Sequence, residues 1–338
     1  MSPPQAAIAN TEAIIQAIRP RLTRVIIFLN GKGGTGKTTL TGNTAANLAA
    51  AMVSAQSNRR ILAIDFDPQG NLALDLRYAT HPENDQGGSI DDLIRGRGQL
   101  RIIRDVRPQL DVVPGGEQLG YVRGSLFSAG KMANGREPRL SFAYALAQVA
   151  HEYEWILIDC PPGEPELQDL AAVAGRFVMV PCKFDEGSID GLSKVSSVFE
   201  AARALNGELE LLGVALFGFG RTNLRTQRDA DGEAVGVKEV GQVARVRARI
   251  TKLLQEAGIE APVLDSVITD APVIAEMARR FGWTFAEIAD QAVSEEWRKE
   301  ARQTGFTIAA DSAETAAAEH EALTAEVIAY AQKAVVPV

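Results

Sequence analysis

The sequence has few of the residues that build disulfide frameworks and metal sites. It contains two cysteines, Cys160 and Cys182, and three histidines among 338 residues. Their spacing matches neither a disulfide framework nor a set of metal ligands, so a reducing cytosolic setting is expected. No apolar run approaches the roughly 18 residues of a membrane-spanning helix. The N-terminus also lacks the apolar core of a secretory signal.

Positive charge is scarce relative to negative charge. Lys and Arg number 35 and Asp and Glu number 43, which gives a formal net charge of −8. A chain with this balance has no overall attraction to nucleic acid, so any contact with DNA requires a local basic surface. The length allows a substantial core, either as one large α/β domain or as one domain with appendages.

The most informative segment is a strand, a glycine-rich loop and a helix in direct succession. The apolar run Val25–Leu29 predicts a buried parallel strand, and the periodic segment Leu40–Met52 predicts a helix. The pattern G-x-x-x-x-G-K-[ST] lies between them, filled by Gly31, Gly36, Lys37 and Thr38.

Such a loop binds phosphate because its backbone N–H groups converge on the anion and the helix N-terminus adds partial positive charge. We expect Lys37 to reach the β- and γ-phosphates and the hydroxyl of Thr38 to ligate Mg²⁺. The expected phosphate-binding residues are Gly33, Gly34, Thr35, Gly36, Lys37, Thr38 and Thr39.

Two further predicted strands end in carboxylates. Ile61–Ile64 is followed by Asp65 and Asp67, and Trp155–Ile158 is followed by Asp159. Ligands of a parallel α/β sheet lie at the carboxyl ends of its strands, so these side chains should face the same crevice as the loop. The expected fold is a doubly wound, mostly parallel α/β sheet of the P-loop NTPase type, with helices on both faces and an α-helical C-terminal extension.

Three motifs resemble those of one family. The segment Lys32-Gly-Gly-Thr-Gly-Lys-Thr38 resembles the deviant Walker A motif of the ParA/MinD ATPases, and Asp65-Phe-Asp-Pro-Gln-Gly-Asn71 resembles their switch I segment. Ile158-Asp-Cys-Pro-Pro162 matches the Walker B segment of the ParA type. The resemblance covers roughly residues 24 to 290 and is closest to the ParA (Soj-like) partition ATPases.

The resemblance implies an Mg²⁺-dependent ATPase that forms a homodimer when ATP is bound. Lys32 is expected to reach the nucleotide held by the other subunit and to act in catalysis with Lys37. Asp67 is expected to orient the attacking water, while Asp65 and Asp159 support the magnesium shell with Thr38.

The resemblance also implies binding partners and a place in the cell. The ATP dimer would bind nonspecific DNA and leave it after hydrolysis stimulated by a ParB-like centromere-binding protein or an adaptor. The implied function is DNA or plasmid partition by a cytoplasmic, nucleoid-associated protein without stable membrane association.

The densest basic region lies in the C-terminal half, where ParA relatives bind DNA. A solvated helix face explains the same charges equally well, and both readings remain open. The candidate DNA-binding residues are Arg221, Arg245, Arg247, Arg249 and Lys252.

Outside the resemblance the chain is expected to carry two additions. Residues 1–23 would form an extension with a short helix capped by Thr11, and residues 291–338 a helical insertion and a final helix near Ala316–Lys333. Residues 115–140 are expected to be a surface excursion. Thr269-Asp-Ala-Pro272 replaces the proline-arginine-asparagine segment usual in relatives, so no adenine contacts are assigned.

Two alternative functions are compatible with the same ATPase activity. The protein could be a MinD-like membrane-cycling ATPase, or a ParA-like ATPase that positions a protein cargo. The final helix carries Glu319, Glu321 and Glu326 and lacks the basic apolar face of a membrane-surface helix. A metabolic enzyme with the same loop would need a glutaminase triad or cluster-ligand cysteines, and the sequence shows neither.

Overall fold

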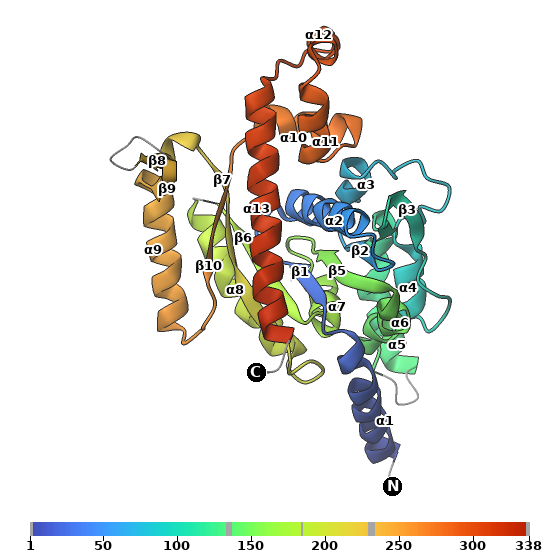
Figure 1. The fold of residues 1–338 in the computed structure, drawn as a ribbon. Coiled ribbons are helices and arrows are strands. Elements are labelled where there is room, and N and C mark those ends of the chain that lie inside the picture. The colour runs from blue at the N-terminus through green and yellow to red at the C-terminus, as the bar shows by residue number, and fades with distance from the viewer. Residues whose placement is uncertain (1–2, 133–136, 184, 229–233, 336–338) are drawn as a thin grey trace.

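The computed structural model describes residues 3–132, 137–183, 185–228 and 234–335. Within this part of the chain, the main sheet has eight strands, and all neighbours are parallel except the edge pair β3 and β4 (Figure 1). Their order across the sheet is β10 (Val263–Thr269), β7 (Glu210–Phe219), β6 (Phe177–Cys182), β1 (Val25–Phe28), β5 (Tyr153–Asp159), β2 (Arg60–Asp65), β4 (Leu110–Val113) and β3 (Ile103–Arg107).

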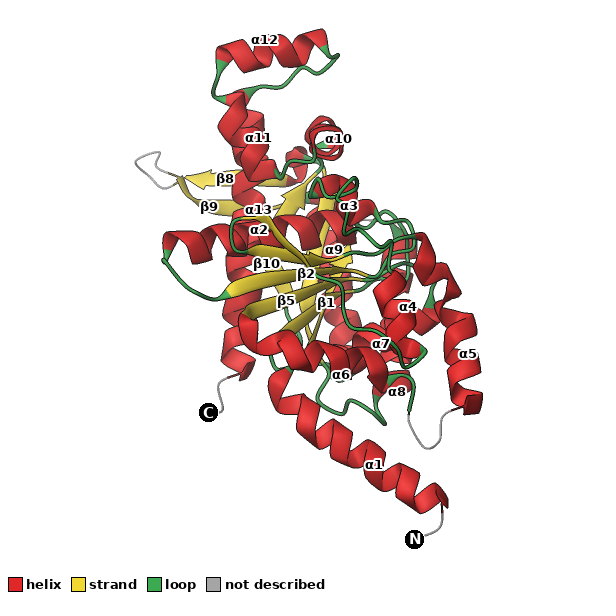
Figure 2. Ribbon diagram, turned by 90° about the vertical axis from the view of Figure 1, so that its right-hand side faces the viewer, coloured by secondary structure: helices red, strands yellow, loops and turns green. Residues whose placement is uncertain are grey.

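Helices cover both faces of this sheet, and a separate cluster of buried residues lies under each layer (Figure 2). One face is covered by α2 (Lys37–Ser54), α3 (Asn71–Asp75) and α13 (Ala310–Val335). The other is covered by α4 (Gly88–Ile94), α5 (Val122–Met132), α6 (Leu140–Val149), α7 (Pro165–Ala174), α8 (Glu186–Ala202) and α9 (Gly241–Glu256). The predicted doubly wound α/β fold is therefore confirmed.

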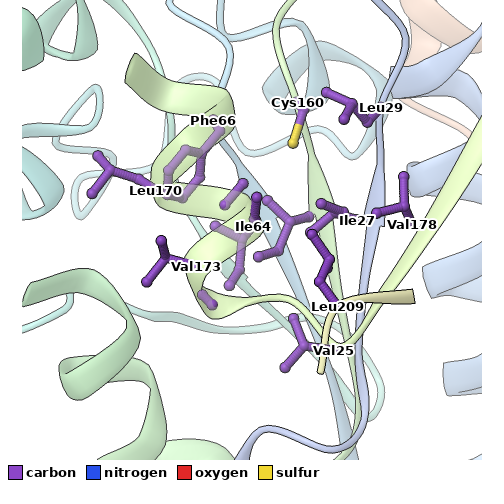
Figure 3. Packing of buried hydrophobic residues seen from close by; sticks show 14 of the residues in the cluster. Val25, Ile27, Leu29, Ile64, Phe66, Cys160, Leu170, Val173, Val178 and Leu209 are labelled. Carbon is purple, nitrogen blue, oxygen red and sulfur yellow. The ribbon is translucent and has the colours of Figure 1, made fainter. Parts of the chain in front are cut away.

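Side chains along the central strands point alternately to the two faces of the sheet, and on both faces they are apolar. Val25, Ile27 and Leu29 belong to the cluster under α7, whereas Ile26 and Phe28 belong to the cluster under α2. In Figure 3, Leu170 of α7 lies beside Phe66 and Val173 of α7 lies beside Ile64. Strands buried on both faces read as continuous apolar runs, and this is why the sequence located them well.

The final helix is part of this core. Leu323, Val327 and Ala331 of α13 are buried against the sheet and α2. Glu326 accepts hydrogen bonds from the backbone N–H groups of Asp265 and Ser266 at 2.7 and 2.8 Å, on the edge strand β10. Since an unpaired strand edge is a site of unwanted association, α13 protects the edge it packs on. The predicted domain limits at residues 23 and 290 stay predictions.

Three short helices precede α13 and lie beyond the sheet in Figure 1: α10 (Pro272–Phe281), α11 (Phe285–Ala292) and α12 (Glu295–Gln303). They share a small hydrophobic cluster with the first turns of α13. Arg107 of β3 ties this unit to the body through Glu287, with both distances 2.8 Å, and through the carbonyl of Gly282. None of the described helices is long and apolar enough to cross a membrane.

Local expectations failed at two places, and a third segment contains an element for which no prediction was made. The N-terminal helix α1 (Pro3–Ile18) begins before Thr11, because proline is accepted in a first helical turn that needs no N–H donor. The glycine-rich excursion of residues 115–140 contains α5. The polar connection after β7 contains an antiparallel hairpin of β8 (Leu224–Arg228) and β9 (Ala234–Glu239).

His320 of α13 predicts a pH dependence of stability. It is 2% exposed, its Nε2 has no hydrogen-bond partner within the described residues, and its ring lies edge-on against Phe285 at 4.5 Å. Burial lowers its pKa from 6.5 to about 3. Between these values only the unfolded chain takes up the proton, so folding stability falls as pH falls.

His320→Leu should remove this loss, which amounts to about 2 kcal/mol between pH 8 and pH 5. Urea unfolding at both pH values measures it. The exposed His151→Gln should retain the wild-type dependence. An unchanged difference between the two pH values in His320→Leu would contradict the prediction.

Candidate phosphate-binding site

The loop between β1 and α2 has the backbone shape of a phosphate cradle. Gly36 caps α2 with a φ of 90°, and Gly34 has a φ of 72°, both in the left-handed region that favours glycine. A Cβ on Gly36 would also lie 2.6 Å from the ring of Phe217. The loop conformation and its close packing on Phe217 therefore both require glycine at this position.

A cavity of about 440 Å³ opens over this loop. Its volume suits a small organic ligand such as a nucleotide. Asp270 and Arg279 close it on the side of α10. The loop side consists of Gly34, Thr35, Gly36, Lys37, Thr38 and Thr39, and the remaining wall includes Asp67, Lys183, Phe217 and Thr269.

Lys37 provides a buried cation at the base of the cavity. Its side chain is held by the backbone carbonyl of Lys32, which accepts a hydrogen bond from Nζ at 3.0 Å. Burial lowers the pKa of Lys37, and the neighbouring Asp159 opposes that shift. A buried ammonium with few partners is well suited to an anionic ligand, because the ligand replaces the lost hydration.

Three carboxylates meet at this edge, as the sequence predicted. Asp65 and Asp159 are neighbours in register on β2 and β5. Asp65 accepts the N–H groups of Asp67 and Leu72 at 2.9 and 3.3 Å, and Asp67 accepts that of Gln69 at 2.9 Å. Burial raises the pKa of Asp65 well above its usual range, and repulsion from Asp159 adds to the shift.

Asp159 fits a magnesium site. Both of its carboxylate oxygens are buried and have no partner in good hydrogen-bond geometry among the described residues, although the hydroxyl of Thr38 lies close enough to lower the pKa of this carboxyl. Burial raises its pKa to about 7, opposed by Thr38 and Lys37. The described residues contain no group of three or more acidic, histidine or cysteine side chains that could hold a metal alone. The donors therefore suit a hydrated Mg²⁺ that takes its other ligands from phosphate.

Lys32 lies outside this cavity. Its ammonium pairs with Asp185, just before α8, and its side chain is 41% exposed. Its backbone N–H is held by Asn30 Oδ1 at 2.9 Å. A contact with the nucleotide of a second subunit involves a partner chain, so this role stays a prediction.

The candidate DNA-binding residues separate into two groups. Arg245, Arg249 and Lys252 are exposed on the outer face of α9, opposite its buried apolar residues. Arg247 is engaged within the chain, because it pairs with Glu239 and donates to the carbonyls of Val263 and Leu264 at 2.7 Å. Arg221 lies elsewhere and donates to the carbonyl of Ser312 at 3.3 Å.

Sequence reasoning missed three residues that line the cavity. Lys183 follows β6, Phe217 belongs to β7, and Arg279 belongs to α10. The Nζ of Lys183 lies 5.6 Å from the centroid of the Phe217 ring. No motif marks these positions. Only the atypical Thr269–Pro272 segment indicated that this side of the site differs from that of relatives.

A parallel sheet with a glycine-rich loop, a buried lysine and carboxylates at adjacent strand ends defines a P-loop nucleotide hydrolase. An AAA domain family matches residues 23–211, more than half of the chain. The chain belongs to the ParA/Soj/MinD family of ATPases, and the ATPase activity follows from that membership.

Named relatives agree with this assignment. The chain is 33% identical to the chromosome partitioning protein ParA of Caulobacter vibrioides over 210 residues, which cover 61% of this chain and 74% of that protein. Two solved structures share the fold. The McdA–ATP complex of Cyanothece has a TM-score of 0.60 at 15% identity, with 84% of this chain and 97% of that one covered. MinD of Pyrococcus horikoshii with Mg-ADP has a TM-score of 0.55 at 22% identity, with 90% and 95% covered.

Asp159→Asn should separate stability from magnesium binding. Removing one buried charge beside Asp65 should raise the melting temperature of the nucleotide-free protein by about 2–4 °C. The variant should also lose most of the further rise that Mg-ATP causes in the wild type, because the amide binds Mg²⁺ poorly. Thermal unfolding with and without Mg-ATP measures both effects. A full Mg-ATP response in the variant would contradict this placement of the metal.

Proposed function

We propose that this ATPase is a partition ATPase that dimerises on ATP, binds nonspecific DNA and is released when a partner stimulates hydrolysis. The observation that carries the proposal is the 33% identity to a chromosome partitioning protein over 210 residues, together with the family match over residues 23–211, which contain all three nucleotide motifs. The cargo is a plasmid or chromosome partition complex, and a protein assembly moved by the same cycle is the nearest variant.

The nucleotide site supports the first step of this cycle. Gly33 to Thr39 bind the phosphates of ATP, and Lys37 neutralises their charge. Thr38, Asp65 and Asp159 hold Mg²⁺, directly or through water, and the ion supplies further charge neutralisation when bound. Asp67 orients the attacking water from the cavity wall. Positioning and charge are most of what phosphoryl transfer requires of a protein.

The exposed face of α9 supports the second step. Arg245, Arg249 and Lys252 are spaced so that one side of the helix presents all three side chains. Against a net charge of −8, such a local surface is what DNA binding requires. Arg247 is left out because its side chain is only 21% exposed and is held by Glu239, whereas the side chain of Lys252 is 74% exposed. DNA binding in turn supports a cytoplasmic, nucleoid-associated location.

The packing of α13 disfavours the MinD-like alternative. A membrane-cycling helix has to leave its own domain and lay an apolar face on lipid. Glu319 of α13 instead accepts the N–H and hydroxyl of Thr269 at 2.8 and 2.9 Å, and Glu326 accepts two N–H groups of β10. The acidic helix is held on the sheet and carries no basic face.

The dimer is tested on a background in which turnover is blocked. Asp67→Ala should form dimers in saturating Mg-ATP, and Asp67→Ala with Lys32→Ala should stay monomeric, because each lysine supplies charge to the other subunit's nucleotide. Light scattering after size exclusion measures the mass. Asp67→Ala with Lys299→Ala, a lysine exposed on α12, is the control. A monomer in all three would exclude the ATP dimer, and a dimer in all three would exclude the role of Lys32.

DNA binding is tested with a labelled random duplex by fluorescence anisotropy. Wild type should bind with ATP and fail to bind with ADP or without nucleotide. The triple variant Arg245→Ala, Arg249→Ala and Lys252→Ala should bind weakly at every salt concentration. Its plot of log affinity against log salt should be shallower by about one for each lost phosphate contact.

A control with equal charge removes Arg95, Arg97 and Arg101, which lie near the opposite edge of the sheet and pair with Asp91, Asp92 and Asp85. It should bind DNA like wild type. If both triple variants lose the same amount of DNA affinity, the effect is due to net charge and not to the surface of α9. ATP-dependent binding to anionic liposomes without binding to duplex would favour the membrane-cycling alternative instead.

A further inference from the structure

Arg279 occupies a position between two cavities. It lines the cavity over the phosphate-binding loop and also a neighbouring cavity of about 460 Å³ between α2, α3 and α10. Thr39, Ala275 and Phe285 line both cavities as well. The guanidinium is therefore within reach of the nucleotide site, although α10 lies outside every nucleotide motif in the sequence.

Arg279 pairs with Asp75, which lines the neighbouring cavity and not the cavity over the phosphate-binding loop. Its Nε lies 3.4 Å from Oδ1 of Asp75, a contact between residues 204 positions apart. The side chain of Arg279 is 52% exposed, whereas that of Asp75 is 14% exposed. The carboxylate is thus fixed and enclosed, while the arginine extends from the surface of α10 and has room to move.

Asp75 is linked to the nucleotide site through α3. This helix begins at Asn71, the last residue of the segment Asp65–Asn71. Its backbone begins at the site, because the N–H of Leu72 donates to Asp65 at 3.3 Å. Asp75 is the last residue of the same short helix. One end of α3 therefore contacts a carboxylate of the proposed magnesium site, and the other end contacts Arg279.

We propose that Arg279 is a nucleotide-binding residue that exchanges Asp75 for a phosphate of the bound nucleotide. This inference rests on the proposed nucleotide site. A guanidinium binds phosphate by charge-assisted hydrogen bonds, which are stronger than a single long contact to a carboxylate. The exchange releases α10 from α3, and the helical unit of α10, α11 and α12 thereby responds to occupation of the site.

Competition between the two partners gives the proposal its test. If Asp75 and phosphate compete for the same arginine, removal of Asp75's charge favours the nucleotide, whereas removal of the arginine disfavours it. Burial raises the pKa of Asp75 and Arg279 opposes that shift, which agrees with an enclosed carboxylate that depends on one cation.

The experiment measures the affinity of Mg-ADP by calorimetry at fixed salt. Arg279→Ala should weaken binding about tenfold or more, the size expected for one lost charged hydrogen bond. Asp75→Asn should tighten binding roughly two- to fivefold, because the competing ion pair is a single 3.4 Å contact whose arginine is half exposed. The double variant should bind like Arg279→Ala alone.

The matched control is Arg280→Ala. Arg280 is the next residue on α10, lines only the neighbouring cavity, and contacts the carbonyl of Thr304 at 3.3 Å and the ring of Phe306. It should bind Mg-ADP within twofold of wild type. Circular dichroism confirms that each variant is folded.

Failure of this inference is distinguishable from failure of the proposed site. A wild type that does not bind Mg-ADP overturns both. If wild type binds and Arg279→Ala binds within twofold of it, the arginine does not contact the nucleotide. If Asp75→Asn binds equally or more weakly than wild type, the competition is wrong.

Discussion

The accumulation of uncompensated charge at one edge of the sheet is the constraint on which the rest of the structure depends. Asp65, Asp67 and Asp159 meet beside a single buried ammonium, that of Lys37. Both oxygens of Asp159 are buried, and only the hydroxyl of Thr38 among the described side-chain donors lowers the pKa of this carboxyl through a hydrogen bond. Buried charges of this kind cost stability unless a counter-charge arrives. The two apolar layers and the strands buried on both faces offset this loss of folding free energy. A bound Mg²⁺ would neutralise the carboxylates, and the phosphates bound with it would neutralise Lys37.

The C-terminal helices act on the same edge from outside the motifs. α13 closes the β10 side of the sheet with apolar contacts and two glutamates, and α10 places Arg279 on the wall of the cavity. Arg107 fastens this unit to the end of α3 by donating to the carbonyl of Leu76 at 2.9 Å, in addition to its contacts with Glu287 and Gly282. The segment after residue 270 thus belongs physically to the nucleotide site, although the three motifs end at residue 162.

Much of the positive charge on the surface is neutralised locally. Many basic residues pair with acidic neighbours, as Arg60 does with Asp111 and Arg139 with Asp169. On α9 the apolar stripe faces the core, and Arg247 beside it pairs with Glu239. Arg245, Arg249 and Lys252 share the outward face, where Lys252 also lies 3.6 Å from Glu256. In an acidic protein, a cluster of this kind confines attraction for a polyanion to one surface and leaves the remainder repulsive.

The sequence by itself determined the strands, the phosphate-binding loop and the carboxylates beside it. An apolar run predicts a buried strand, a glycine pattern predicts the loop, and the ends of parallel strands place the carboxylates at one edge of the sheet. The start of α1, the hairpin after β7 and α5 were missed or misplaced, since a proline-led, glycine-rich or polar segment has no strong period of its own. Only the tertiary structure decided that Arg247 is engaged within the chain, that α13 covers the sheet, and that Arg279 meets Asp75. These outcomes depend on what lies across from each side chain after folding, and contacts between residues 204 positions apart leave no local pattern.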